Sequence, residues 1–190
     1  MENPADGILR RGNLVVTPCV TDDLLAQAYL TYRKENTLPV IFFQAIPTLK
    51  DFVDAHLEVG SRIVLGCFRV NDETKAVEFC GLGWISDSVR MGGHCKAETG
   101  IGMFRCAGID SLEFGKMMLD CFFSKYDIDV IFGVTPEANR LALRYAQKLH
   151  FDLSSPIEDY VTWNGQLAPG IISHMSKKQW QERNRPLPEV

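Results

Sequence analysis

The chain has 190 residues, of which 46% are hydrophobic and 23% are charged, and its formal net charge at pH 7 is -4. This composition is that of an ordinary globular domain and excludes collagen-like, low-complexity and disordered classes. The acidic balance lacks the basic excess of nucleic-acid-binding proteins, so no nucleic-acid partner is expected. Long apolar runs and a basic secretory start are also absent, so we expect a cytoplasmic chain with no membrane partner.

The N-terminal third predicts one strand followed by two helices. Residues 1–12 are expected to be a mobile lead-in, and residues 13–20 a first strand. Asp22 or Asp23 is expected to cap the next helix. Its apolar face would be formed by Leu24, Leu25, Ala28, Tyr29 and Tyr32. Residues 41–43 form a short apolar run without a clear period. A second helix should begin at Thr48, with Asp51 completing a variant capping box, and end at Gly60.

The rest of the chain alternates between strand-like and helix-like patterns. Strands are predicted over residues 62–70, 77–86, 98–104, 129–134, 151–163 and 170–175. The polar segment 71–75 predicts a hairpin turn, and Asn164-Gly165 a second one. A helix is predicted from Ser111 to Tyr126. Another should begin at Thr135-Pro136-Glu137, run to about His150 and place Ala138, Leu141, Ala142, Tyr145 and Leu149 on its core side.

The predicted order of elements is β-α-α-β-β-β-α-β-α-β-β. It favours an α/β (α+β) fold with a mixed, mostly antiparallel sheet flanked by helices. We expect a single domain over residues 13–180 and a polar C-terminal tail over residues 181–190. The cysteines show no C-x-x-C spacing, so no metal site is predicted from motifs.

Several runs resemble the GNAT superfamily of acyl-CoA-dependent N-acetyltransferases. The best match is residues 130–151 (VIFGVTPEANRLALRYAQKLHF), with its strand, its helix bearing Asn139 and an ending similar to K-L-G-F, in which His150 replaces the usual Gly. The run 171–180 (IISHMSKKQW) is similar to the closing strand and final M-[ST]-x-x-x-W of the branch that acetylates protein N-termini and related amines. Glu98-Thr99-Gly100 resembles the E-x-G of the family's fourth strand. The resemblance implies the acyl-CoA N-acyltransferase fold.

The resemblance also implies acetyl-CoA as co-substrate. In this family the pyrophosphate lies on a loop of the form [QR]-x-x-G-x-[GA] at the start of a helix. Arg105 and Gly108 match the first and fourth positions, but Asp110 replaces the final Gly or Ala, so the loop is eroded. Asp110 could cap the helix itself, with Glu113 completing a capping box, and would then repel a phosphate. The implied cofactor-binding residues are Met103, Phe104, Arg105, Ala107, Gly108, Ile109, Asp110, Ser111 and Asn139.

Acetyl transfer to an amine requires a base, a donor to the thioester carbonyl and an acid for the leaving thiolate. By family position, Glu98 is the candidate base, and a backbone N–H of Met103 or Phe104 is the candidate donor. The usual acidic Tyr position is Ala146 here, so the adjacent Tyr145 is the candidate acid, with core packing as its alternative role. Asn139 would hold the pantetheine arm or cap its helix. His56 is a secondary candidate, with a core role as the alternative.

Two functions remain open at this point. The first is an N-acetyltransferase that moves an acetyl group from acetyl-CoA to a primary amine, which would be a protein N-terminus, a lysine or a small amine. The acidic balance slightly favours a cationic acceptor. The second is a catalytically degenerate GNAT-like binding or assembly module, which the eroded loop and the missing Tyr would favour. The sequence leaves the oligomeric state open.

Overall fold

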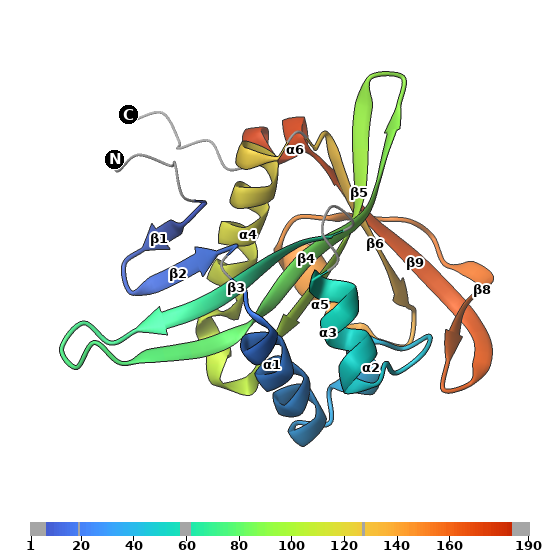
Figure 1. Cartoon of the computed structure of the whole chain (residues 1–190). Coiled ribbons are helices and arrows are strands. Elements are labelled where there is room, and N and C mark those ends of the chain that lie inside the picture. The colour runs from blue at the N-terminus through green and yellow to red at the C-terminus, as the bar shows by residue number, and fades with distance from the viewer. Residues whose placement is uncertain (1–6, 19, 58–61, 127, 184–190) are drawn as a thin grey trace.

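The computed structural model describes residues 7–18, 20–57, 62–126 and 128–183. These residues form one nine-stranded sheet in the order β1-β2-β3-β4-β5-β6-β9-β7, with β8 paired to β9 (Figure 1). The strands are β1 (Leu9–Arg11), β2 (Leu14–Thr17), β3 (Arg62–Val70), β4 (Val77–Met91), β5 (His94–Met103), β6 (Val130–Pro136), β7 (Asp152–Leu153), β8 (Ile157–Trp163) and β9 (Gln166–Ser176). The helices are α1 (Asp22–Lys34), α2 (Leu38–Ile41), α3 (Leu49–Leu57), the 3₁₀ segment η2 (Arg105–Asp110), α4 (Ser111–Lys125), α5 (Arg140–Lys148) and α6 (Lys177–Arg183).

Parallel pairing occurs at one place in this sheet, between β5 and β6. The two strands pair over three positions only, from Lys96 opposite Val130 to Glu98 opposite Phe132. Beyond this point each strand continues, β5 to Met103 and β6 to Pro136, without further pairing to the other. The sheet therefore opens between β5 and β6, and the ribbons diverge below their crossing in Figure 1.

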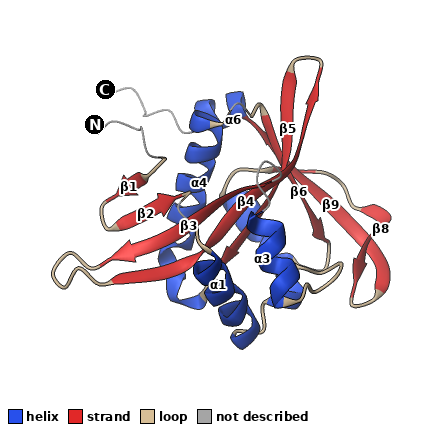
Figure 2. Ribbon diagram, viewed as in Figure 1, coloured by secondary structure: helices blue, strands red, loops and turns tan. Residues whose placement is uncertain are grey.

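Helices cover both faces of the sheet (Figure 2). Helices α1 and α3 lie on one face, where Leu25, Tyr32 and Phe52 are buried against β3 and β4. Helix α4 lies on the opposite face, and its Phe114 and Met118 are buried in a second cluster. Because the side chains of a strand alternate between faces, β3 contributes to both clusters. One hydrophobic core therefore lies on each face of the sheet.

The predicted fold class is confirmed: the structure is a mixed, mostly antiparallel sheet flanked by helices. The strand over residues 62–70 and the turn over 71–75 lie where the sequence predicts them. Thr48 and Asp51 form the predicted reciprocal cap: the N–H of Asp51 donates to Thr48 Oγ1 at 3.2 Å, and the N–H of Thr48 donates to Asp51 Oδ2 at 3.4 Å. Asn164 and Gly165, at φ 52° and 78°, form the turn between β8 and β9.

The N-terminal predictions need two corrections. Residues 9–11, expected within a mobile lead-in, form β1 and pair with β2, and Arg11 forms ion pairs with Glu113 and Asp120 of α4. The cap of α1 is Thr21, whose Oγ1 accepts from Leu24 N–H at 3.4 Å, so neither Asp22 nor Asp23 is the cap. The predicted helix end at Gly60 lies outside the described residues.

The C-terminal half needs further corrections. Thr135-Pro136-Glu137 does not begin a helix: β6 extends to Pro136 because it pairs with β9 as far as Gly170, and α5 begins at Arg140. On the predicted core side of this helix, Leu149 is buried and Tyr145 packs against the core, but Ala138 and Leu141 are exposed and Leu143 is buried instead. The predicted strand over 151–163 is split into β7 and β8, and α6 reaches Arg183 inside the expected tail. Within the described residues, no helix is long and apolar enough to span a membrane.

Candidate active site

A cavity of about 840 Å³ occupies the opening between β5 and β6. Its walls come from the loop after α1, from β4, β5 and β6, from the turn before α4 and from α5. The opening exists because β5 and β6 stop pairing after Glu98 and Phe132. From Thr99 to Met103, the edge of β5 that would otherwise pair with β6 faces the cavity. Such an edge can accept an extended ligand as an additional strand.

An aromatic cluster forms one wall of the cavity. Trp84 on β4 stacks on Phe42 with ring centroids 5.9 Å apart and planes inclined by 9°. The indole lies over Gly100 of β5, where an added Cβ would come within 2.1 Å of the ring. Gly100 is therefore required for this placement of Trp84. Phe43 also lines the cavity and lies 6.3 Å from the ring of Trp163 on β8.

Glu98 lies at the point where the two strands part. In the register of the sheet it is opposite Ser86 of β4 and Phe132 of β6. Ser86 is in turn opposite Arg62 of β3, and Arg62, Ser86 and Glu98 all line the cavity. Directly opposed residues point to the same face of a sheet, so a polar row crosses the floor of the cavity beside the aromatic wall. The predicted base is thus at a position where it can meet a ligand.

His56 is buried behind this wall, and it does not line the cavity. Its Nδ1 lies 2.7 Å from the carbonyl oxygen of Phe52, and its ring packs against Phe52 and edge-on to Trp84. Desolvation lowers the pKa of His56 to about 4. The structure therefore favours the core role that the sequence left as the alternative.

The turn before α4 closes one end of the cavity. Gly108 has φ 51° and ψ -125°, a backbone conformation that residues other than glycine rarely adopt. The space where its Cβ would lie is open, with no neighbouring atom within 4 Å. Helix α4 begins immediately after the turn and has no side-chain cap. The N–H of Ser111 donates to the carbonyl oxygen of Gly108, and no side chain caps the N–H groups that follow it in this 15-residue helix.

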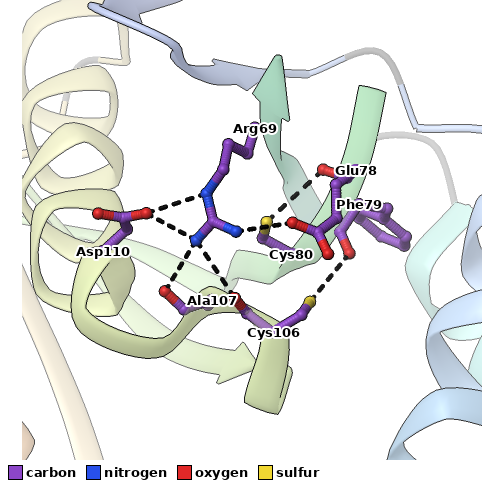
Figure 3. A network of polar contacts seen from close by, with 7 residues as sticks. All are labelled: Arg69, Glu78, Phe79, Cys80, Cys106, Ala107 and Asp110. Atoms are coloured by element: carbon purple, nitrogen blue, oxygen red, sulfur yellow. Dashed lines mark hydrogen bonds and ion pairs between the residues drawn. The ribbon is translucent and has the colours of Figure 1, made fainter. Parts of the chain in front are cut away.

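Asp110 does not cap α4, which corrects the predicted capping box. Its Oδ2 accepts from Arg69 Nε at 3.0 Å and Nη2 at 2.6 Å (Figure 3). Glu113, the predicted second member of the box, pairs with Arg11. Arg69 also donates to the carbonyl oxygens of Cys106 and Ala107 at 3.2 Å each. The guanidinium of Arg69 on β3 thus holds the carboxylate of Asp110 in an ion pair, while it also pairs with Glu78 at 2.7 Å.

Glu35, at the C-terminal end of α1, is a site residue that sequence reasoning missed. Both of its carboxylate oxygens lie 3.1 Å from the backbone nitrogen of Arg105, which donates to them. Arg105 Nη2 in turn donates to the carbonyl oxygen of Glu35 at 3.3 Å. The two residues are 70 positions apart, and no local motif signals the contact. A carboxylate therefore already accepts a hydrogen bond from one backbone N–H of the predicted pyrophosphate-binding loop (residues 105–111), which we call the anion loop.

Of the two predicted donors to a thioester carbonyl, only one remains. The N–H of Phe104 donates to the carbonyl oxygen of Cys80 at 2.9 Å, which corrects its assignment as donor. Met103 is the last residue of β5 and lines the cavity next to it. The side chain of Phe104 also lines the cavity and packs on Tyr32 at 5.0 Å between ring centroids.

Asn139 and Tyr145 both line the cavity from α5, and both have structural partners. Asn139 Oδ1 accepts from the N–H of Ala142 at 3.2 Å, so this side chain caps α5. The hydroxyl of Tyr145 donates to the carbonyl oxygen of Ser111 at 2.6 Å, which joins α5 to the first residue of α4. Burial raises the pKa of Tyr145 above its usual value. Gly115 leaves room for this hydroxyl, since an added Cβ would lie 2.5 Å from it.

Most predicted site residues therefore meet around one cavity. Eight of them line it: Glu98, Met103, Phe104, Arg105, Gly108, Ser111, Asn139 and Tyr145. Three predicted residues of the turn do not. Ala107 is fully buried and its N–H donates to Phe104, while the side chain of Ile109 is 96% exposed and that of Asp110 is held by Arg69.

No protein-family model matches the chain, and no curated protein matches it by sequence. Solved structures do match its fold. Spermidine N-acetyltransferase from Vibrio cholerae, in complex with CoA and spermine, aligns with a TM-score of 0.72 at 12% identity over 90% of this chain and 99% of that one. A GNAT-family acetyltransferase from Bacillus anthracis aligns with a TM-score of 0.66 at 11% identity over 90% and 99%. The chain has the GNAT fold.

A third GNAT structure, the ribosomal-protein-S5-alanine acetyltransferase from Vibrio fischeri, gives a TM-score of 0.68 at 14% identity over 94% of this chain and 99% of that one. These alignments extend over nearly the whole length of each chain. The aligned region therefore covers most of the sheet and its helices.

Proposed function

We propose that the protein is an N-acetyltransferase that transfers an acetyl group from acetyl-CoA to a primary amine. One observation carries the proposal. The cavity between β5 and β6 ends at the exposed backbone of Gly108 and the uncapped start of α4, while Arg69 holds the carboxylate of Asp110 in an ion pair. The repulsion that the sequence predicts between Asp110 and a phosphate is thereby reduced.

Acetyl-CoA supplies the activated acetyl group, and the chain would bind it in three places. The unpaired edge of β5 would take the pantetheine arm as an additional strand. Asn139 caps α5 through its Oδ1, and its Nδ2 amide would be the group that reaches the arm. The uncapped first-turn N–H groups of α4 and the backbone around Gly108 would bind the pyrophosphate, because a helix N-terminus favours anions.

In the proposed reaction, the amine must lose a proton and the thioester carbonyl must be polarised. Glu98 would accept the proton, directly or through one water, and the N–H of Met103 would donate to the carbonyl oxygen. Tyr145 would protonate the leaving thiolate only if its hydroxyl left the carbonyl of Ser111. Its hydrogen bond supports the packing role more strongly than the acid role.

The acceptor end of the cavity suits a cationic amine. Glu98 lines the cavity on the same side as the aromatic rings of Trp84, Phe42 and Phe43, whereas Glu35 lines it at the turn before α4, against the N–H of Arg105. Carboxylates attract an ammonium group, and aromatic faces attract it further by cation–π interaction. Among the fold neighbours, one structure contains spermine, another enzyme is named for an alanine of ribosomal protein S5, and a third is named as a ribosomal L7/L12 α-N-protein acetyltransferase. Small polyamines and protein N-termini are therefore the first acceptors to test.

The second candidate is a non-catalytic GNAT-like module. The contact of Glu35 with the N–H of Arg105 favours it, because a carboxylate already holds part of the anion loop. Ala146 at the family's usual Tyr position favours it as well.

Binding and turnover separate the two candidates. Calorimetry with CoA and thermal unfolding with acetyl-CoA should both report binding, with about 2.7 kcal/mol of stabilisation at one hundred times the dissociation constant. Millimolar acetyl-CoA that leaves the unfolding midpoint unchanged would reject the enzyme. Glu98→Gln should retain CoA binding and lower kcat at neutral pH by about 100-fold, the ordinary contribution of a general base. The matched control, Glu73→Gln in the exposed β3–β4 turn, should leave kcat unchanged.

A further inference from the structure

A cluster of two thiols and a carboxylate lies outside the cavity, on the outer side of the turn that precedes α4 (Figure 3). Glu78 and Cys80 lie two positions apart on β4, and Cys106 comes from η2. The two Sγ atoms and a carboxylate oxygen of Glu78 are all within 4.8 Å of one another. None of the three residues lines the cavity, so the cluster is distinct from the proposed acetyl-transfer site.

The spacing of these donor atoms is close to that of a metal-ligand set. In a tetrahedral zinc site with Zn–S bonds of about 2.3 Å, neighbouring ligand atoms are about 3.5 to 3.8 Å apart. The three atoms would therefore need to move inward by about 1 Å or less each. Cys80 is buried, whereas Cys106 and Glu78 are exposed, so the cluster has one fixed ligand and an open approach from solvent.

The surrounding charges are compatible with a cation at this place. Arg69 Nη1 donates to Glu78 Oε2 at 2.7 Å, which leaves the other carboxylate oxygen of Glu78 for a ligand. The charge of Arg69 is already shared with Asp110, at 2.6 Å. Two thiolates and one carboxylate would carry three negative charges, and a divalent cation would balance two of them.

Thiolate donors determine the class of metal. Magnesium and calcium require oxygen ligands, whereas sulfur ligands select zinc and softer transition metals. A disulfide between Cys80 and Cys106 would use the two thiols but would give Glu78 no role, and both cysteines are free in the structure. The convergence of all three donors favours a metal.

We propose that Glu78, Cys80 and Cys106 form a binding site for a thiophilic divalent transition-metal ion such as zinc, with solvent as the fourth ligand. On binding, each thiol loses a proton to solvent, and no oxidation or reduction takes place. The site would join β4 to the turn that carries Gly108.

The test uses the full-length, fully reduced protein and titration with Co²⁺ and then Zn²⁺. Co²⁺ should add one equivalent of near-ultraviolet thiolate-to-metal absorption, and Zn²⁺ should displace it and raise the unfolding midpoint. Cys106→Ser, which changes an exposed side chain, should abolish the absorption. Glu78→Gln should weaken Co²⁺ binding by at least about 10-fold, because even outer-shell partners contribute that much. The controls are Cys121→Ser and Glu73→Gln, and both should bind Co²⁺ as the unchanged protein does.

Three outcomes would overturn the proposal. The first is a reduced, folded protein that gives no thiolate absorption with Co²⁺. The second is absorption that persists in Cys106→Ser, because this variant is expected to fold whether or not Cys80→Ser does. The third is a protein isolated without reductant in which peptide mapping finds Cys80 joined to Cys106, which would assign the pair as a disulfide.

Discussion

Replacing Arg69 by methionine should weaken the binding of CoA, although Arg69 does not line the cavity. In the structure its guanidinium donates twice to Asp110 Oδ2 and also to two carbonyl oxygens of the turn. Without it, Asp110 regains an uncompensated charge next to the uncapped start of α4. The side chain can then cap the helix or repel an anion there, as the sequence alone predicts.

The expected loss of CoA affinity depends on how far the Arg69–Asp110 ion pair is exposed to water. The side chain of Arg69 is 26% exposed and that of Asp110 is 30% exposed, so screening by water is substantial. For a carboxylate about 7 Å from a phosphate, at an effective dielectric of about 40, repulsion costs about 1 kcal/mol per unit of phosphate charge. A pyrophosphate would lose about 1 to 2 kcal/mol, and the dissociation constant would rise about 5- to 30-fold.

Calorimetry with CoA at low ionic strength measures this change, and a double variant identifies its cause. Arg69→Met with Asp110→Asn removes both charges, so its affinity should return to within about threefold of the original value. Arg10→Met is the matched control, because it breaks an exposed pair with Asp72 at a distance from the turn. Unchanged affinity in a folded Arg69→Met variant would refute the reasoning. A double variant as weak as Arg69→Met would assign the loss to the broken contacts with the turn.

Three further predictions concern single side chains. Glu35→Gln should bind CoA about fivefold more tightly, because it removes about 1 kcal/mol of repulsion from the loop; weaker binding by calorimetry would mean that the contact with Arg105 orders the loop. Tyr145→Phe should lower the free energy of unfolding in urea by about 1 kcal/mol, since the half-buried carbonyl of Ser111 loses its donor; a simultaneous large fall in kcat would assign Tyr145 as the acid. Because burial lowers the pKa of His56 from 6.5 to about 4, the unfolded state binds more protons between these values, and stability should fall as pH falls through that window. His56→Phe should remove this pH dependence, which amounts to at most about 3 kcal/mol of unfolding free energy across the window. An unchanged slope of unfolding free energy against pH in the variant would contradict the prediction.

The parts of the fold that the sequence predicts are those whose signals are local. Residues 62–70 form a strand-like, mostly apolar run ahead of a polar turn, and they form β3 over the same nine residues. Thr48 and Asp51 are three positions apart, so their reciprocal cap requires no distant partner. Asn164 and Gly165 tolerate positive φ, which the turn between β8 and β9 requires.

The missed features depend on partners that are distant in sequence. Thr135-Pro136-Glu137 has every local mark of a helix start, but pairing with β9 extends β6 through Pro136 and delays the helix. Asp110 has the local marks of a cap, but Arg69, 41 positions earlier, holds its carboxylate. In both cases tertiary contacts outweigh a preference of about 1 kcal/mol.

Two acidic residues therefore lie near the anion loop. The sequence suggests that Asp110, inside the loop, would oppose an anion, but in the structure Glu35 is the acid that contacts a loop N–H. Asp110 lies inside the loop but is paired with Arg69, whereas Glu35 is distant in sequence and contacts the N–H of Arg105. If charge determines affinity here, Arg69→Met and Glu35→Gln should change CoA binding in opposite directions and by similar factors. The variant that combines them should then bind CoA nearly as the original chain does. A combined variant as weak as Arg69→Met alone would show that the geometry of the loop, and not its charge, limits binding.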